Sequence, residues 1–237
     1  MGWTEAAGGM SLALATGLGV ALFHPRAMWF GPGIWRGPTD RPWVALTFDD
    51  GPHPEYTPRV LDVLERHRAP ATFFCVGASV ERNRAIARRA HEAGHELANH
   101  TFQHGTGGDL FDSRRLQPDL ERCQAALRDI TGTRCRYYRP AVGIRNPEVH
   151  RAARALDLTV VTWTDSARDG AFALTEKRAQ RIALRAGPGS ILTLHDGTAR
   201  TTSALREATL RHLPLLLGTL RKRGLEPVTL SALLTPT

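Results

Sequence analysis

Lysine is almost absent from this chain of 237 residues: it occurs only at Lys177 and Lys222, so arginine carries nearly all of the formal charge of +8. The arginines are scattered along the sequence and form no tract with interleaved aromatic residues. A nucleic-acid-binding surface needs such a cluster to engage phosphates. We therefore expect no nucleic-acid partner. A solvated arginine-rich surface is the expected role of these residues, with weak attraction to an anionic cell wall or membrane as the alternative.

Cysteine is also scarce, and the three cysteines form no C-x-x-C motif. An odd number without that motif indicates neither a zinc ribbon nor a disulfide framework. Cys75 lies in the apolar run 71–76, which predicts a buried thiol that packs as a small hydrophobic group. A glycine-rich phosphate loop, an internal repeat and a low-complexity segment are missing as well. The absence of the phosphate loop argues against a nucleotide-binding open sheet.

The N-terminus has a long uncharged stretch, Ala6–Phe23, which is rich in alanine, leucine and glycine. Its length is close to the minimum of about 18 residues for a membrane-spanning helix. Glu5 stands where a signal peptide would carry positive charge. Arg26 and Arg36 come after the stretch, and by the positive-inside bias they favour a cytoplasmic location for the segment that contains them. An uncleaved membrane anchor, a signal peptide and an apolar flap on the domain all stay open.

From residue 43 onward, short apolar runs alternate with longer amphipathic stretches, which is typical of repeated βα units. The predicted strands cover residues 44–48, 71–76, 96–99, 136–139, 158–163, 190–195 and 227–230. The predicted helices cover residues 57–67, 80–93, 113–131, 146–156, 175–186 and 203–223. We expect residues 1–41 to form an N-terminal segment and linker, and residues 42–237 to form one α/β domain.

Polar clusters follow most of the predicted strands. Parallel strands with short crossovers form either a closed barrel or a doubly wound sheet. A barrel collects residues from the carboxyl ends of many strands at one mouth, as these clusters require. We therefore expect a barrel whose mouth holds Asp49, Asp50, His100, His104, Arg139, Asp169, His195 and Asp196.

His100 and His104 have the i, i+4 spacing that places two imidazoles on one face of a helical turn. Such a pair suits a divalent metal, because neutral imidazole is a preferred zinc ligand. A solvated or structural pair is an equally open interpretation. Asp49 and Asp50 favour the metal site, since consecutive residues at a strand end point in opposite directions. One carboxylate can then bind the metal while the other acts beside it, although Asp-Asp-Gly-Pro could also be a simple turn.

Four segments in order carry a resemblance to a known family: Thr47–Pro52 (TFDDGP), Asn99–His104 (NHTFQH), Arg139–Gly143 (RPAVG) and Leu194–Asp196 (LHD). They resemble the motifs of the polysaccharide deacetylases, carbohydrate esterase family 4, which have a NodB homology domain. The resemblance extends from about residue 42 to the C-terminus. It implies a distorted (β/α)7 barrel in a single domain.

The resemblance also implies roles for individual residues. By similarity, Asp50, His100 and His104 bind a divalent metal, usually zinc. Asp49 resembles the general base of the family. Arg139 resembles the arginine that keeps this base ionised, which requires a permanent cation.

The second half of the chain supplies the other residues that the family pattern implies. His195 resembles the general acid that protonates the leaving amine, and Asp169 resembles the carboxylate that orients it. The backbone N–H of Val142 corresponds to the family's oxyanion donor. Trp163 and Leu194 are expected to line the substrate pocket, with core packing as the alternative.

The chain departs from the family pattern around the expected acyl pocket. Ser166 stands at the first acidic position of the Asp169 motif, and Gly170 stands at its second tryptophan. Thr193 replaces the leucine two residues before His195. The loss of the tryptophan removes a wall of the acetate pocket, so the accepted acyl group or sugar could differ.

These observations lead to one main expectation and two alternatives. We expect a metal-dependent hydrolase that removes N-acetyl groups from amino sugars of a cell-envelope or chitin-like polysaccharide. The alternatives are an O-acetyl esterase or N-deformylase acting on another glycan or glycolipid, and a carbohydrate-binding protein with a vestigial metal site. The expected location is the cell envelope or the exterior, with membrane association through residues 6–23 if these form an anchor. The oligomeric state stays open.

Overall fold

The computed structural model describes residues 22, 24–105, 108–197 and 203–235. Its strands are β1 Trp43–Asp49, β2 Thr72–Cys75, β3 Glu96–Asn99, β4 Tyr137–Tyr138, β5 Thr159–Val160, β6 Asp165–Ser166, β7 Ile191–His195 and β8 Glu226–Val228. Its helices are α2 Tyr56–Arg66, α3 Gly77–Arg82, α4 Arg84–Glu92, α5 Ser113–Thr131, α6 Pro147–Ala155, α7 Glu176–Arg185, α8 Ser203–Lys222 and α9 Leu230–Leu234. Two short 3-10 helices are η1 Gly108–Phe111 and η2 Ala141–Gly143.

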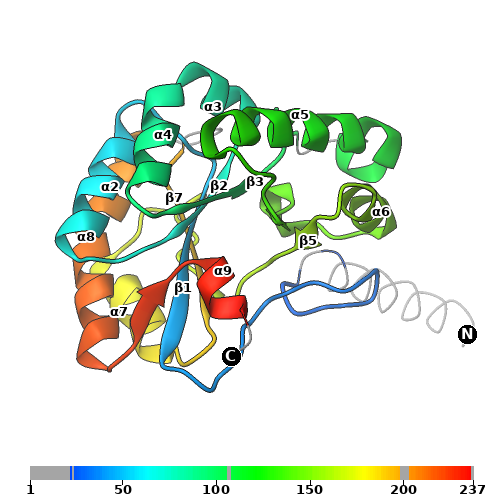
Figure 1. Ribbon diagram of the computed structural model, residues 1–237. Coiled ribbons are helices and arrows are strands. Elements are labelled where there is room, and N and C mark those ends of the chain that lie inside the picture. The colour runs from blue at the N-terminus through cyan, green and yellow to red at the C-terminus, as the bar shows by residue number, and fades with distance from the viewer. Residues whose placement is uncertain (1–21, 23, 106–107, 198–202, 236–237) are drawn as a thin grey trace, which may run out of the picture.

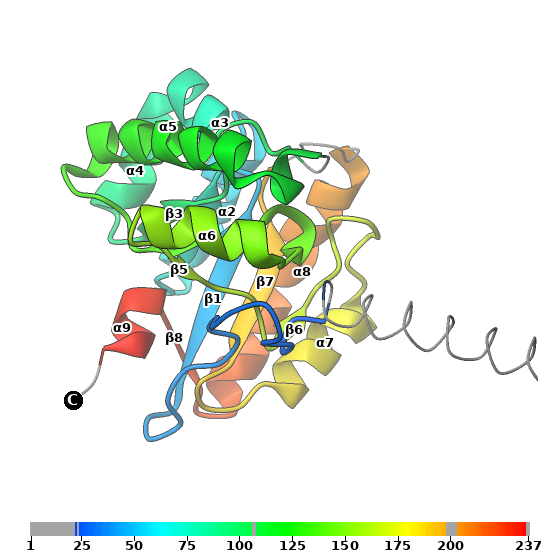
Figure 2. The ribbon, with the colours of Figure 1, turned by 90° about the vertical axis from the view of Figure 1, so that its right-hand side faces the viewer.

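All strand pairs are parallel, and the sheet runs β5-β4-β3-β2-β1-β7-β6, with β8 also paired to β1. The long strand β1 lies at the centre and contacts β2, β7 and β8. The sheet curls, and helices wrap its outer face, as Figures 1 and 2 show from two directions. This arrangement confirms the predicted α/β fold, a distorted (β/α)7 barrel in a single domain.

Side-chain alternation along the strands divides the core into an outer and an inner part. On β1, Leu46 and Phe48 pack outward against the surrounding helices. Ala45 points inward, where it joins Phe74 of β2 and Ile191 of β7. Helix α9 closes the end of this interior at which the strands begin, so the opposite end, where they finish, is left for the site.

One predicted element is divided in the structure, and another is shorter than predicted. The predicted helix 80–93 is split into α3 and α4 at Asn83, whose backbone has φ −123° and ψ 42°. The Asn83 side chain donates hydrogen bonds to the Pro52 and Ser79 carbonyls, which ties the break to the loop after β1. The predicted strand 158–163 is reduced to β5, and β6 begins only after its predicted end. The described part of the chain therefore has an 8-stranded sheet where seven strands were expected.

Residues 24–41 run along the β5–β6 side of the barrel. Ile34 forms a bridge to Val161, and Arg36 forms one to Ser190. The buried Arg145 side chain donates hydrogen bonds to the His24 and Ala27 carbonyls. The stretch 6–23, for which an anchor, a signal or a flap was expected, lies outside the described residues except for residue 22. None of the helices within the described ranges is long and apolar enough to cross a membrane.

Candidate active site

Strand β1 delivers two carboxylates to the mouth of the barrel in different directions. Asp49 is the last residue of β1 and is only 4% exposed. Asp50 follows with φ 76°, so its side chain turns away from that of Asp49. In the parallel register Asp49 lies opposite His195 of β7. The backbone thus directs the two carboxylates to different places, as the sequence predicted.

Asp50, His100 and His104 converge to form a group that can hold a metal ion. Their ligand atoms all lie within 4.8 Å of one another. Asp50 Oδ1 is 3.3 Å from His100 Nε2 and 3.0 Å from His104 Nε2. Tetrahedral ligands at zinc distances are roughly 3.4 Å apart, so these residues fit such an ion. Burial opposes ionisation of Asp50, but both imidazoles hold the pKa of its carboxyl well below the usual range.

The two histidines do not lie on a helical turn, as their spacing had suggested. They lie in the loop after β3, where Thr101 has φ 72° and His104 has φ 54°. Asn99 Oδ1 accepts a hydrogen bond from the Thr101 N–H at 2.9 Å. Asp119 of α5 accepts another from the Phe102 N–H at 2.7 Å. The loop, held by these side chains, brings both imidazoles to Asp50.

The tautomer of His100 follows from its hydrogen bond to the backbone. Its Nδ1 lies 2.7 Å from the Arg139 carbonyl oxygen, which can only accept. Nδ1 therefore carries the proton, and the lone pair of Nε2 faces Asp50 as a metal ligand must. His100 is 2% exposed, so packing fixes the ring in this orientation.

Asp49 forms a buried ion pair with Arg139. Arg139 Nη1 donates to Asp49 Oδ1 at 2.7 Å and to Thr47 Oγ1 at 2.8 Å. Arg139 Nη2 donates to the Thr162 carbonyl at 2.9 Å, and the whole residue is inaccessible to solvent. Burial lowers the pKa of the guanidinium, while Asp49 opposes that shift. The pair gives the buried Asp49 carboxylate a counter-charge, and this carboxylate can accept a proton at the mouth.

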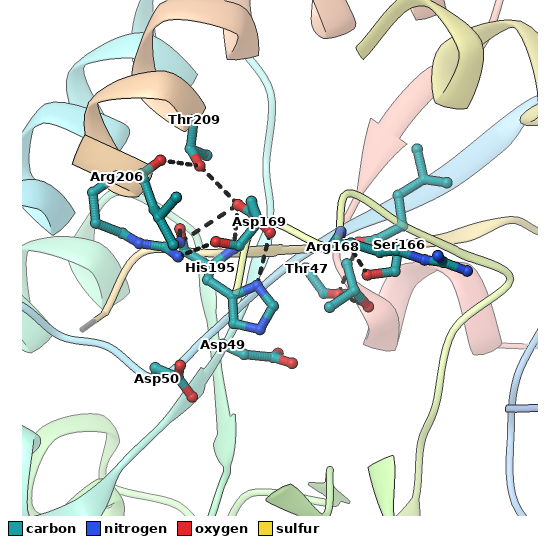
Figure 3. Close-up of polar contacts among 12 residues, drawn as sticks. Thr47, Asp49, Asp50, Ser166, Arg168, Asp169, His195, Arg206 and Thr209 are labelled. Atoms are coloured by element: carbon teal, nitrogen blue, oxygen red, sulfur yellow. Dashed lines mark hydrogen bonds and ion pairs between the residues drawn. The ribbon is translucent and has the colours of Figure 1, made fainter. Parts of the chain in front are cut away.

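His195 lies at the end of β7 and forms a second pair with Asp169. His195 Nδ1 is 2.8 Å from Asp169 Oδ1, and Asp169 Oδ2 accepts a bond from Thr209 Oγ1 at 2.8 Å. The buried Arg206 of α8 donates to the Asp169 carbonyl oxygen and forms an ion pair with its carboxylate. In Figure 3 the imidazole points toward Asp49 and Asp50, while Thr209 and Arg206 lie behind Asp169. The motifs singled out neither Arg206 nor Thr209.

The charge of His195 is favoured by its surroundings. Burial alone would lower the pKa of the imidazole, but Asp169, with further help from Asp49 and Asp50, raises it to about 9. A protonated Nε2 is therefore available near neutral pH in this arrangement. A group of this kind can serve as a general acid on one side of a reacting centre.

The two carboxylates that β1 delivers and the three imidazoles line a cavity of about 420 Å³ at the mouth of the barrel, whereas Arg139 and Asp169 lie behind its wall. Its lining residues are Asp49, Asp50, His100, His104, Val142, Gly143, Trp163, Ser166, Arg168, Gly170, Ala171, Phe172, Thr193 and His195. The placement of Val142 and Trp163 agrees with their expected position. Leu194 lies instead in the outer core and is 1% exposed. Alternation along β7 explains the error, because it turns Thr193 and His195 to the cleft and Leu194 away.

The cavity wall beside His195 is open because residue 170 is glycine. A β-carbon on Gly170 would lie 2.8 Å from His195 Nε2, in the space next to the proton-bearing nitrogen. Two residues later, Phe172 lines the same cavity and is 62% exposed. Val142, with φ 50°, is 58% exposed on the same cavity. The cleft thus offers apolar side chains at its rim and an uncovered imidazole within.

The sequence profile of the polysaccharide deacetylases matches residues 36–161, which is more than half of the chain. The chain belongs to the polysaccharide deacetylase family. Among the relatives of this deacetylase, a chitooligosaccharide deacetylase of Bradyrhizobium sp. (strain ANU 289) is 36% identical over 202 residues, covering 77% of this chain and 86% of the relative. A peptidoglycan-N-acetylglucosamine deacetylase of Bacillus cereus is 33% identical over 202 residues, covering 84% and 92%.

Solved structures show the same relationship between this deacetylase and the family. A family 4 acetyl xylan esterase from Clostridium thermocellum, solved with cobalt, is 32% identical with a TM-score of 0.72; the match covers 81% of this chain and 89% of the other. A family 4 carbohydrate esterase from Streptomyces lividans, solved with acetate, is 26% identical with a TM-score of 0.70, covering 80% and 93%. The fold is therefore shared with these two carbohydrate esterases.

Proposed function

We propose that the protein removes acetyl groups from N-acetylated amino sugars of a cell-envelope or chitin-like polysaccharide, and releases acetate. The observation that carries this proposal is the placement of His195, backed by Asp169, beside the same cavity as Asp49 and the metal-binding group. An amine is a poor leaving group unless it is protonated as the bond breaks. A partly buried and charged imidazole at the mouth meets that requirement.

Asp50, His100 and His104 hold the metal in this proposal. Two neutral imidazoles and one carboxylate form a donor set of the kind found in catalytic zinc sites, so zinc is the proposed ion. When bound, it supplies Lewis-acid polarisation of the acetyl carbonyl and stabilises the charge that develops there.

The remaining steps use residues of the chain itself. Asp49 takes a proton from the attacking water, and Arg139 supplies the counter-charge 2.7 Å from its Oδ1. The backbone N–H of Val142 is the proposed donor to the oxyanion. His195 gives its Nε2 proton to the leaving nitrogen, and Asp169 keeps the imidazole oriented and charged. The products are acetate and a sugar with a free amine.

The walls of the cavity position the sugar. Trp163 is the proposed contact for the acetyl group, because its side chain lines the cavity beside Gly143. Phe172 and Val142 at the rim offer apolar faces to a sugar ring. Leu194 has no part in this proposal, since it lies in the core.

O-deacetylation is the second candidate function. The observation in its favour is the likeness to the acetyl xylan esterase from Clostridium thermocellum, which is 32% identical. An ester releases an alcohol, which depends less on the acid than an amine does. A strong loss of activity on removal of His195 would therefore favour the amide substrate over the ester.

The proposed place of action is the cell envelope or the exterior, where relatives named for peptidoglycan and chitooligosaccharide would meet such polymers. Attachment to a membrane through residues 6–23 is part of this proposal. Fractionation of cells that express the full chain and a chain without residues 1–23 tests it: only the full chain should sediment with membranes.

The test of the activity is acetate release from N-acetylglucosamine oligomers and, in parallel, from O-acetylated xylan. Metal-stripped protein is assayed with and without added zinc, and Asp49→Asn is the control. We expect zinc-dependent release from the amino sugar that Asp49→Asn abolishes. Release from xylan alone would replace the proposed reaction with ester hydrolysis. If the protein binds metal and glycan but releases acetate from neither substrate, it is a carbohydrate-binding protein.

A further inference from the structure

A second and larger cavity lies on the other side of the metal-binding group. It has a volume of about 620 Å³. Its lining residues are Asp50, Pro52, His53, Pro54, Val76, Ala78, Ser79, Arg82, Asn83, Phe102, Gln103 and His104. Asp50 and His104 also line the first cavity, so the two spaces meet at the metal-binding residues. A volume of this size is within the range of about 300–1,000 Å³ that small-ligand sites occupy.

The lining of this second cavity suits a sugar unit. His53, Asn83 and Gln103 offer polar groups to hydroxyls. Burial lowers the pKa of His53, which favours its neutral form; because its Nδ1 accepts the Glu55 N–H, its Nε2–H is left to donate to a hydroxyl. Asp50 contributes the one carboxylate among the described lining residues, and it belongs to the metal-binding group.

Arg82, the last residue of α3, supplies an unpaired positive charge to the cavity lining. Its Nη2 donates to Ser79 Oγ at 3.2 Å, and it forms no ion pair with any residue described in the structure. The adjacent Glu81 does not neutralise it, because Glu81 lies 3.6 Å from Arg122 instead. The cavity therefore lies between a metal-binding group and an arginine that has no acidic partner among the described residues.

We propose that the second cavity binds the sugar next to the one being deacetylated, and that Arg82 recognises a carboxylate on that neighbouring sugar. The inference rests on the proposed deacetylase function and names its substrate class: an acidic glycan in which carboxylate-bearing sugars adjoin N-acetylated amino sugars. A guanidinium binds a carboxylate through charge-assisted and often bidentate hydrogen bonds. One unpaired guanidinium matches the single charge of a carboxylate.

The test compares glycan strands of equal length that differ in the carboxylate. One substrate alternates N-acetylglucosamine with a sugar bearing a carboxylate, and the other is the same strand with that carboxylate reduced to an alcohol. We expect wild-type kcat/KM to be about tenfold or more higher for the acidic strand, mainly through KM, because a charge-assisted bond is worth about 1.5 kcal/mol or more. Arg82→Gln should remove this difference, and Arg82→Lys should restore part of it.

Arg88 provides the matched control, because it is an exposed arginine of α4 that lines neither cavity. Arg88→Gln should keep the wild-type ratio between the two strands. A wild-type ratio near one, or an equal ratio in wild type and Arg82→Gln, would overturn the proposal. Both strands are also titrated into Asp49→Asn with and without Arg82→Gln by calorimetry. If neither strand is hydrolysed, the proposed reaction fails, while the affinities still decide whether Arg82 selects the carboxylate.

Discussion

The Arg139 guanidinium and the Asp49 carboxylate lie 2.7 Å apart at the closed side of the cleft, where Arg139 is inaccessible to solvent and Asp49 is nearly so. Each charge is the principal partner of the other, and Arg139 has no access to solvent that could replace Asp49. Removal of one partner therefore leaves a buried charge uncompensated, which costs far more than the pair itself contributes.

Arg139→Gln should destabilise the protein by about 3–5 kcal/mol, because Asp49 would stay buried without its cation. Chemical denaturation of wild type, Arg139→Gln, Asp49→Asn and the double variant measures the coupling. We expect the double variant to be more stable than the sum of the two single losses allows. Strictly additive losses would mean that the two charges do not interact as the geometry indicates.

The pairing of His195 with Asp169 predicts a change in the pH dependence of activity. Asp169 raises the pKa of His195 to about 9, so the protonated acid is present below that pH and is lost above it. Asp169→Asn removes the charge, and the basic limb of the kcat/KM profile should move to lower pH by about one unit or more. Asp165→Asn is the control, because Asp165 pairs with Arg185 instead. A limb that stays in place in Asp169→Asn would show that another group controls it.

His104→Ala should weaken metal binding, because it removes one of three ligands that lie close together. The readout is the metal-dependent rise in melting temperature of stripped protein, which for wild type corresponds to about 2.7 kcal/mol at a metal concentration 100 times the Kd. The variant should show little of this rise at the same concentration. His91→Ala, on the exposed side of α4, should behave as wild type. If the metal stabilises both variants equally, His104 is not a ligand of the metal.

Asp196 predicts a pH dependence of stability in the metal-stripped protein. Burial, with Asp50 nearby, raises the pKa of its carboxyl to about 7, and Thr57 Oγ1 donates to Oδ2 at 2.5 Å. A raised pKa means that the folded state holds the proton more tightly than the unfolded state. The stabilisation of the folded state by the proton on Asp196 is therefore complete below about pH 4. It is lost as the pH rises through 7.

The shift from 3.8 to about 7 corresponds to a loss on the order of 4 kcal/mol. The Asp196→Asn variant has no titratable group at this position. Its free energy of unfolding should therefore change less between about pH 4 and pH 8 than that of wild type. Denaturant titrations at both pH values measure the difference. The same pH dependence in both proteins would show that Asp196 is not the responsible group.

Much of the site could be predicted because parallel βα units bring the carboxyl ends of their strands to one mouth. The predicted strand 44–48 matched β1 closely, and the polar residues after it came to the cleft as expected. His100 and His104 also met Asp50, although their i, i+4 spacing suggested a helical turn and the structure has a loop. Their convergence depends on the Asp119 carboxylate of a later helix, which no local pattern reveals.

Other residues could not be found from short motifs. Arg206 lies 37 residues after Asp169, on α8, and contacts it only because that helix packs against β7. Thr193 and Leu194 are neighbours in the sequence, yet one lines the cleft and the other lies in the core. The motif predicted the strand, whereas the direction in which the strand faces was decided by its pairing with β1.

By itself the sequence determined the fold class, the order of the βα units and the chemical groups at the barrel mouth, because hydrophobic periodicity and residue type are local properties. The tertiary structure decided which atoms meet: the Nε2 atoms of both histidines at Asp50, Arg139 at Asp49, and an unpaired Arg82 beyond them in the described part of the chain. These contacts join segments far apart in the chain. They depend on strand register and helix packing, in which a shift of one residue would turn every side chain to the opposite face.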